Sequence, residues 1–297
     1  MAQTQMALDS LDFDGTVALA TKVAPHVDIL EIGTPCIKHN GIEMLKTLRA
    51  KFPNNKILVD LKTMDAGFYE AEPFYKAGAD ICTVLGTADI GTLKGVIDVA
   101  NKYGKMAQVD LINVTDKKAR TLEVAKLGAH IIGVHTGLDQ QAAGQTPFAD
   151  LAMVTGLNTG AKVSVAGGVK AATVRQVVDA GADIVVAGAA IYGAADPAAS
   201  AKEITGLAHG SAAASAGGMG KYLPWILIAG AVLLGLYLLS GKKTEEIPAA
   251  TNAAAPAVEQ VAPAADTAVP APAADAAAPA DAAAPADATA APAAEAK

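Results

Sequence analysis

Three observations predict an α/β fold, a closed (β/α)₈ TIM barrel followed by one transmembrane helix and a disordered tail. Short apolar segments recur about every 20 to 30 residues up to residue 210. The composition then changes abruptly, and one uncharged stretch near residue 230 is long enough to cross a bilayer. The predicted units are a barrel over 1–209, a flexible linker over 210–221, a helix over 222–240 and a tail over 241–297.

The barrel is predicted from eight apolar runs with helical spacing between them. Residues 41–52 and 89–103, for example, repeat apolar side chains at intervals of three and four, as on one face of a helix. The main alternative is an open, doubly wound sheet. Eight near-regular units favour a closed barrel, and no Gly-x-Gly-x-x-Gly pattern follows the first strand. The runs are 6–8, 29–32, 57–59, 81–85, 106–109, 131–134, 163–165 and 184–187.

The stretch 222–239 is uncharged and is followed by Lys242 and Lys243. As a helix it would span about 27 Å, close to the thickness of a bilayer core. A buried core helix is the alternative, but the barrel is complete without it. The sequence therefore predicts a single-pass, membrane-anchored protein. We place its barrel on the cytoplasmic side, because no signal peptide precedes the barrel.

The charge lies in the tail. Residues 244–297 hold eight acidic residues and one basic residue, among Ala and Pro, so residues 1–243 have no net charge. A neutral body without a basic patch argues against nucleic-acid binding, and the tail, which is either a spacer or inert, lacks the apolar side chains needed to fold. Only two cysteines, Cys36 and Cys82, are present, which indicates a reducing compartment.

Charged residues follow the ends of the predicted strands. In a barrel of this kind the carboxyl ends of the strands meet at one mouth, where active sites lie. A salt-bridge network that closes the barrel end would explain one such residue better than it explains the whole set. The set is Asp9, Glu31, Asp60, Lys62, Asp65, Asp110 and His135.

Two parts of this set indicate specific chemistry. Asp60 and Lys62 are two residues apart, so in a strand they would share a face. Glu31 and Asp60 would end neighbouring strands and offer the hard oxygen ligands that suit Mg²⁺. His135 has a side chain whose ordinary pKa suits proton transfer near neutral pH.

Small residues follow the last two predicted strands, with Gly167 and Gly168 after one and Gly188 and Ala189 after the other. Such loops expose backbone N–H groups, and in many barrels they bind a phosphate. The sequence therefore predicts a phosphorylated small substrate.

Five segments carry a resemblance to a known family: ALD at 7–9, EIGTP at 31–35, DLKTMDAG at 60–67, HTGLDQQAAG at 135–144 and VAGG at 165–168. Over residues 3–208 the chain resembles the orotidine-5′-phosphate decarboxylase suprafamily, in particular its 3-hexulose-6-phosphate synthases. The resemblance implies a Mg²⁺-dependent aldol condensation of D-ribulose 5-phosphate with formaldehyde, which gives D-arabino-hex-3-ulose 6-phosphate. This reaction fixes formaldehyde in the ribulose monophosphate pathway.

The resemblance also implies roles for individual residues. Glu31 and Asp60 would hold Mg²⁺, His135 would remove the C1 proton, and Lys62 would stabilise the enediolate. Asp9 and Asp65 would orient Lys62 and substrate hydroxyls, with Asp65 reaching into the neighbouring subunit of a homodimer. A downstream isomerase is a further partner that we expect.

Three alternatives remain open. The nearest relative, 3-keto-L-gulonate-6-phosphate decarboxylase, would use the same site, although residues 138–144 lack the arginine expected there. A Schiff-base aldolase would use Lys62 as its nucleophile. A self-assembling scaffold displayed on a membrane would need no charged mouth.

Overall fold

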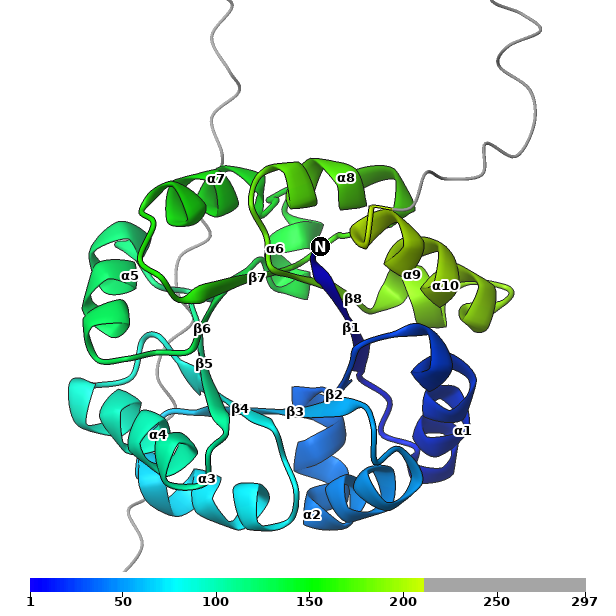
Figure 1. Cartoon of the computed structure of the whole chain (residues 1–297), viewed down its shortest axis with the longest axis horizontal. Coiled ribbons are helices and arrows are strands. Elements are labelled where there is room, and N and C mark those ends of the chain that lie inside the picture. The colour runs from blue at the N-terminus through cyan, green and yellow to red at the C-terminus, as the bar shows by residue number, and fades with distance from the viewer. Residues whose placement is uncertain (211–297) are drawn as a thin grey trace, which may run out of the picture. The chain divides into compact units, whose positions relative to one another are not determined.

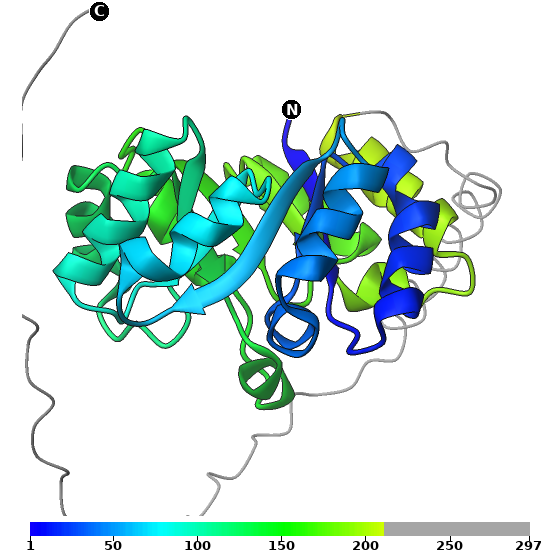
Figure 2. The same cartoon turned by 90° about the horizontal axis from the view of Figure 1, so that it is seen from below.

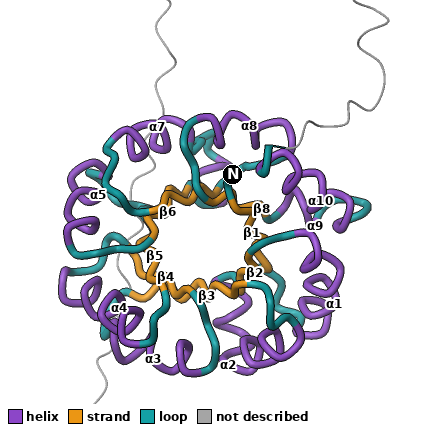
Figure 3. The backbone as a smooth tube through the Cα atoms, viewed as in Figure 1, coloured by secondary structure: helices purple, strands orange, loops and turns teal. Residues whose placement is uncertain are grey.

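The computed structural model describes residues 1–210, which form a closed barrel with strand order β1 to β8 and every pairing parallel. Figure 1 looks down this barrel, and Figure 3 separates the inner ring of strands from the outer ring of helices. The strands are β1 (Gln3–Leu8), β2 (Ile29–Ile32), β3 (Lys56–Thr63), β4 (Ile81–Leu85), β5 (Met106–Asp110), β6 (Ile131–His135), β7 (Lys162–Ala166) and β8 (Ile184–Ala187). The predicted (β/α)₈ barrel is therefore confirmed, and the open sheet is excluded.

Helices follow the strands and cover the outside of the barrel. They are α1 (Phe13–Val23), a short 3₁₀ turn (Ala24–His26), α2 (Thr34–Lys51), α3 (Gly67–Lys76), α4 (Ile90–Lys102), α5 (Lys117–Lys126), α6 (Leu138–Ala142), α7 (Phe148–Gly156), α8 (Ala171–Asp179), α9 (Ala189–Tyr192) and α10 (Pro197–Ala208). The helix predicted at 41–52 is only the second segment of α2, because Gly41 has a φ of 63° and kinks the helix there.

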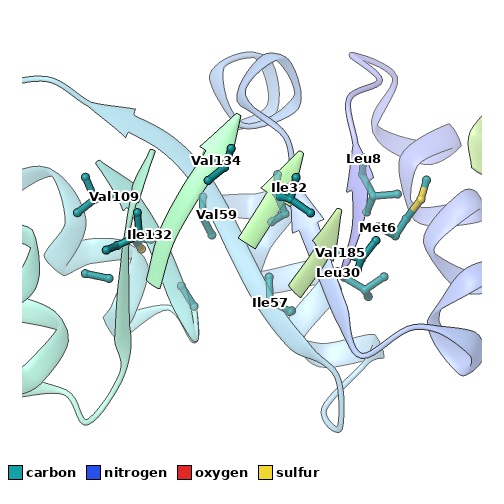
Figure 4. Close-up of a cluster of buried hydrophobic side chains, with 14 of the residues drawn as sticks. Met6, Leu8, Leu30, Ile32, Ile57, Val59, Val109, Ile132, Val134 and Val185 are labelled. Atoms are coloured by element: carbon teal, nitrogen blue, oxygen red, sulfur yellow. The ribbon is translucent and has the colours of Figure 1, made fainter. Parts of the chain in front are cut away.

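Alternation along each strand separates two apolar layers. One face packs against the helices, and Figure 4 shows Met6, Leu8, Leu30, Ile32 and other strand side chains in this layer. The opposite face points into the barrel, where a small group of apolar side chains fills the lower part of the interior. That group comprises Ile29, Leu58, Ile81, Ile131, Ile184 and Val186. The polar side chains of the interior that lie above this group, towards the carboxyl ends of the strands, are those that line the mouth of the barrel.

The prediction of a membrane-anchored protein is corrected here. Within residues 1–210 no helix is both long enough and apolar enough to cross a membrane. The helix predicted at 222–240 lies outside the described residues, as do the tail and nearly all of the linker. Figure 2 shows the described part from the side, with the strands surrounded by helices.

Candidate active site

The carboxyl ends of the strands surround a cavity of about 890 Å³. Nearly all of the predicted site residues line it, and they come from strands far apart in the sequence. The predicted residues that line the cavity are Asp9, Glu31, Asp60, Lys62, His135, Gly167, Gly168, Gly188 and Ala189. The mouth of the barrel thus brings the predicted set into one place, with one exception described below.

Lys62 lies between two carboxylates. Its Nζ is 2.9 Å from Asp60 Oδ2 and 2.8 Å from Asp110 Oδ2. Burial opposes the charge of the ammonium group, but the two carboxylates outweigh it and raise the pKa of Lys62 above its usual value. Lys62 therefore stays protonated throughout the physiological range.

The contact between Asp60 and Lys62 does not arise from simple strand alternation. Lys62 has a φ of 46°, in the left-handed region, and its N–H donates to Thr83 Oγ1 at 3.0 Å. The pairing of β3 with β4 shifts register between Val59 and Thr63. A local irregularity that the sequence did not predict therefore directs the ammonium group towards Asp110 as well as Asp60.

Asp110, at the end of β5, joins Lys62 to His135. Its Oδ2 lies 2.9 Å from His135 Nδ1, and its Oδ1 accepts the N–H of Ile112 at 2.9 Å. Burial alone would raise its pKa, but the hydrogen bond and charge of His135 and the charge of Lys62 outweigh it and lower the pKa of Asp110 to about 2. Asp110 is thus an ionised acceptor that orients the imidazole ring.

Three other carboxylates, those of Asp9, Glu31 and Asp60, lie close enough to influence one another. Burial and the charge of Asp60 raise the pKa of Glu31 well above its usual range, and desolvation and Asp60 also raise that of Asp9. Glu31 Oε2 accepts a hydrogen bond from Gln5 Nε2 at 2.7 Å. Such a cluster of negative charge fits a cation, because positive charge there would relieve the repulsion.

Asp60 is held firmly by its neighbours. Its Oδ1 accepts from Thr83 Oγ1 at 2.7 Å, and its Oδ2 accepts from Thr34 Oγ1 at 2.6 Å. No group of three or more His, Cys, Asp and Glu side chains within residues 1–210 has the arrangement of a metal site. Only two of the carboxylates, those of Glu31 and Asp60, were predicted as metal ligands, so other ligands would have to come from substrate or water.

Two positions near the mouth require glycine because a side chain there would collide with a neighbouring group. Gly167 has a φ of 110°, and a Cβ there would lie 2.4 Å from the carbonyl oxygen of Thr136. Gly33, at the end of β2, leaves room for Asp9, whose Oδ1 would lie 2.0 Å from a Cβ at that position. A side chain at Gly167 would collide with the backbone of Thr136, and one at Gly33 would displace the carboxylate of Asp9.

Asp65 is the predicted site residue that this chain does not bring to the cavity. It is exposed, does not line the cavity, and its Oδ1 accepts the N–H of Ala66 at 2.7 Å. Met64 and Tyr69 beside it are exposed large apolar side chains.

The sequence prediction gave no role to several polar residues of the site. Gln5, Thr34, Thr83 and Asp110 form hydrogen bonds with predicted site residues. Gln108 and Ser164 line the cavity. A signal was present for two of them. Gln108 and Ser164 each interrupt an apolar strand at a position that faces the interior, and a buried polar side chain of this kind needs a reason.

Comparison with known proteins identifies the family of this chain. Residues 2–204 match the model of the orotidine 5′-phosphate decarboxylase / HUMPS family. The chain is 87% identical over 208 residues to 3-hexulose-6-phosphate synthase of Methylomonas aminofaciens, covering 70% of this chain and 100% of that protein. It is 47% identical over 202 residues to the synthase of Mycobacterium gastri, covering 67% and 96%.

Solved structures show the same relationship. The crystal structure of 3-hexulose-6-phosphate synthase from Salmonella typhimurium matches with a TM-score of 0.69 and 38% identity, covering 71% of this chain and 100% of that one. The crystal structure of KGPDC from Streptococcus mutans, solved with a bound ligand, matches with a TM-score of 0.66 and 26% identity, covering 70% and 97%. The chain belongs to the orotidine 5′-phosphate decarboxylase / HUMPS family of enzymes.

Proposed function

We propose that this chain is a 3-hexulose-6-phosphate synthase, which condenses D-ribulose 5-phosphate with formaldehyde to give D-arabino-hex-3-ulose 6-phosphate. The observation that carries the proposal is the chain of contacts from Asp60 through Lys62 and Asp110 to His135 at the barrel mouth. A base and a cation held side by side are what the formation of an enediolate requires. The identity to synthases, up to 87%, supports the choice of reaction.

His135 is proposed as the base. Asp110 is ionised and accepts from Nδ1, so the neutral ring carries its proton on Nδ1 and leaves the lone pair of Nε2 free to accept a proton. That lone pair would take the proton from C1 of the sugar phosphate. The carbanion formed is an enediolate, and C1 then attacks the formaldehyde carbon.

Lys62 is proposed to stabilise the negative oxygen of the enediolate. It is a full positive charge fixed by two carboxylates, so it needs no reorganisation when charge develops in the transition state. The same contacts argue against the Schiff-base alternative, because a nucleophilic lysine must lose its proton and the pKa of Lys62 is raised. Asp9 is proposed to orient substrate hydroxyls at the edge of the mouth.

Glu31 and Asp60 are proposed to hold Mg²⁺. When bound, the ion would supply positive charge for the substrate oxygens. The chain's own part is to keep these two carboxylates close together, and Gln5, Thr34 and Thr83 do so through hydrogen bonds. Removal of divalent ions with EDTA should abolish turnover, and Mg²⁺ should restore it.

The turns after β7 and β8 are proposed to bind the phosphate group. Gly167, Gly168, Gly188 and Ala189 all line the cavity, on the side of the mouth opposite β3 and β4. Their backbone N–H groups provide donors without placing a side chain in the way.

Asp65 is proposed to act in the site of a partner subunit, within a homodimer. Its exposure in this chain and its apolar neighbours Met64 and Tyr69 support this placement. Inactive Asp65→Ala and inactive His135→Ala chains can be mixed. If Asp65 acts across the interface, mixed dimers contain one complete site and regain activity; if it acts within its own chain, they stay inactive.

The alternative activity is that of 3-keto-L-gulonate-6-phosphate decarboxylase (KGPDC). The match to the KGPDC structure supports it as a second candidate. The two are separated by a direct assay. The purified chain with Mg²⁺ should consume ribulose 5-phosphate only when formaldehyde is present and should release no CO₂ from 3-keto-L-gulonate 6-phosphate. Release of CO₂ without formaldehyde-dependent turnover would reverse the assignment, and neither activity would favour the scaffold.

We also propose that residues 1–209 are the complete catalytic unit. The Methylomonas aminofaciens synthase is matched over its whole length by 208 residues of this chain. A chain truncated after residue 210 should therefore match the full chain in activity. The 3-ketose product would next need an isomerase, which is a proposed partner; co-purification of the two would support that partnership.

A further inference from the structure

The floor of the cavity contains a buried amide that the mechanism above does not use. Gln108, on β5, is 8% exposed, and no hydrogen-bond partner is found for its Oε1 within residues 1–210. A buried amide oxygen without a partner costs free energy, so its retention in an interior position needs a reason. The side chain lines the cavity, so a ligand in the cavity can reach it.

Two neighbours converge with Gln108 on one small space. Gly133 on β6 has no side chain, and a Cβ there would lie 3.1 Å from Gln108 Nε2 and 3.4 Å from Ser164 Oγ. Ser164, on β7, pairs directly with Gly133 and is 2% exposed. The glycine therefore leaves room for an amide and a hydroxyl to face the same part of the cavity.

This polar floor, formed by Gln108, Gly133 and Ser164, lies directly beneath the proposed base. Gln108 precedes Asp110 by two residues on β5, and Gly133 precedes His135 by two on β6, so each pair shares a face of its strand. Below the floor the interior is closed by apolar side chains such as Ile131 and Ile184. The space can thus accept a very small polar molecule that has entered past His135.

We propose that the polar floor binds formaldehyde, the second substrate, through its oxygen. This inference rests on the proposed function and deepens it by assigning a place to the aldehyde. Gln108 Nε2 and Ser164 Oγ donate hydrogen bonds to the carbonyl oxygen, which holds the aldehyde carbon towards C1 of the enediolate. The sugar phosphate, which needs the carboxylates and glycine turns, occupies the space above.

The condensation needs no electrons or protons beyond those of the two substrates and His135. The electron pair of the enediolate at C1 forms the new carbon–carbon bond, and the π pair of formaldehyde moves to its oxygen. The proton that His135 removed from C1 returns to that oxygen, which becomes a hydroxyl group. The new hydroxyl can then donate to Gln108 Oε1, so the unpartnered oxygen gains a donor only when product forms.

The test separates binding of the aldehyde from activation of the sugar. Gln108→Met keeps the length of the side chain and removes the amide, and Ser164→Ala removes the hydroxyl. We expect each to raise KM for formaldehyde about tenfold, the effect of one lost hydrogen bond. KM for ribulose 5-phosphate, and the exchange of its C1 hydrogen into D₂O without formaldehyde, should stay within about twofold of wild type.

Thr121→Val is the matched control, because Thr121 on α5 is also buried with an unpartnered hydroxyl but does not line the cavity. It should change none of the three quantities. The inference is overturned if the Gln108 and Ser164 variants leave KM for formaldehyde unchanged, or if they reduce C1 exchange as much as condensation. Should Gln108→Met fail to fold, Ser164→Ala decides alone. Failure of the proposed function is distinct, because then the wild-type chain itself shows no turnover that depends on formaldehyde.

Discussion

Two clusters of charge, each built around one aspartate, lie at opposite ends of the barrel. Asp80 precedes β4 at the amino end, and Asp110 closes β5 at the carboxyl end. Both have cationic partners, and in both the partners outweigh burial and lower the pKa of the carboxyl group. The two clusters differ in what surrounds them, and the difference separates a structural ion pair from the one that we propose is catalytic.

In the Asp80 cluster both carboxylate oxygens of Asp80 have hydrogen-bond or ion-pair partners. Its Oδ1 accepts from Lys105 Nζ at 2.7 Å, its Oδ2 pairs with Arg49, and the same Oδ2 accepts the N–H of Ile57. Arg49 in turn donates to the carbonyl oxygens of Gly78 and Asn55. The network ties the α2–β3 connection to the start of β4, and none of its charged side chains lines the cavity at the mouth.

The Asp110 cluster faces the cavity and shares its partners. Asp110 shares one cation, Lys62, with Asp60, and its other partner is the imidazole of His135, a group that can take up or release a proton. All of these groups line the cavity. Similar ion pairs therefore have different uses, and the two clusters should respond differently to mutation.

The largest expected effect is that of Lys62→Ala. Loss of the cation removes the positive charge that we propose stabilises the enediolate, so kcat/KM should fall about a thousandfold or more. Steady-state kinetics with both substrates measures this. Lys105→Ala, its counterpart in the Asp80 cluster, should keep kcat/KM within about twofold; comparable losses in the two variants would remove the distinction between the clusters.

His135→Asn should follow, with a loss of about 10² to 10⁴ in both condensation and C1 hydrogen exchange, because it removes the proposed base. NMR detects the exchange in D₂O. His130→Asn is the matched control, since His130 Nδ1 accepts the N–H of Ala107 and lies away from the cavity. Undiminished exchange in His135→Asn would assign the base to another residue.

Arg49→Met should lower the free energy of unfolding by about 1 to 3 kcal/mol, because it leaves Asp80 and several carbonyl groups without a donor. Urea unfolding measures the loss. Activity per folded molecule should not change. A drop in kcat without loss of stability would connect the amino end of the barrel to catalysis.

The smallest expected effect concerns acid stability. The folded state lowers the pKa of Asp110 to about 2, so its contribution to stability is full above the ordinary value near 3.8 and is lost as the pH falls towards 2. Asp110→Asn should therefore flatten the dependence of stability on pH in this window. Asp14→Asn, an exposed change on α1, provides the comparison, and equal slopes in both variants would contradict the assignment.

Much of the fold could be predicted from the sequence, because the spacing of apolar residues and the ends of apolar runs are local properties of the chain. Each predicted apolar run lies within an observed strand, and the strand ends identified the mouth. The left-handed backbone of Lys62, the kink at Gly41 and the shared position of Asp110 could not be predicted. The features at Lys62 and Asp110 depend on which strands become neighbours and on a shift of register, and neither can be seen in one strand alone. The kink at Gly41 depends on one left-handed residue inside an otherwise helical pattern.

The sequence predicted which residues form the site, but it did not predict the contacts that join them. Strand ends indicated Asp60, Lys62 and His135, while the contacts that join Lys62 to His135 pass through Asp110, for which no role was assigned. Asp65 shows the converse: its motif predicts a site residue, and the barrel of this chain leaves it exposed. For Gln108 and Ser164 the sequence shows a polar residue inside an apolar strand, but it does not show which groups that residue faces.

We propose that the Asp110 cluster makes C1 of ribulose 5-phosphate acidic. The most direct measurement is the exchange of that hydrogen into D₂O by the wild-type chain, with Mg²⁺ present and formaldehyde absent. We expect exchange at least as fast as condensation, and loss of exchange in His135→Asn. Condensation that proceeds without any exchange at C1, even when formaldehyde is limiting, would contradict it.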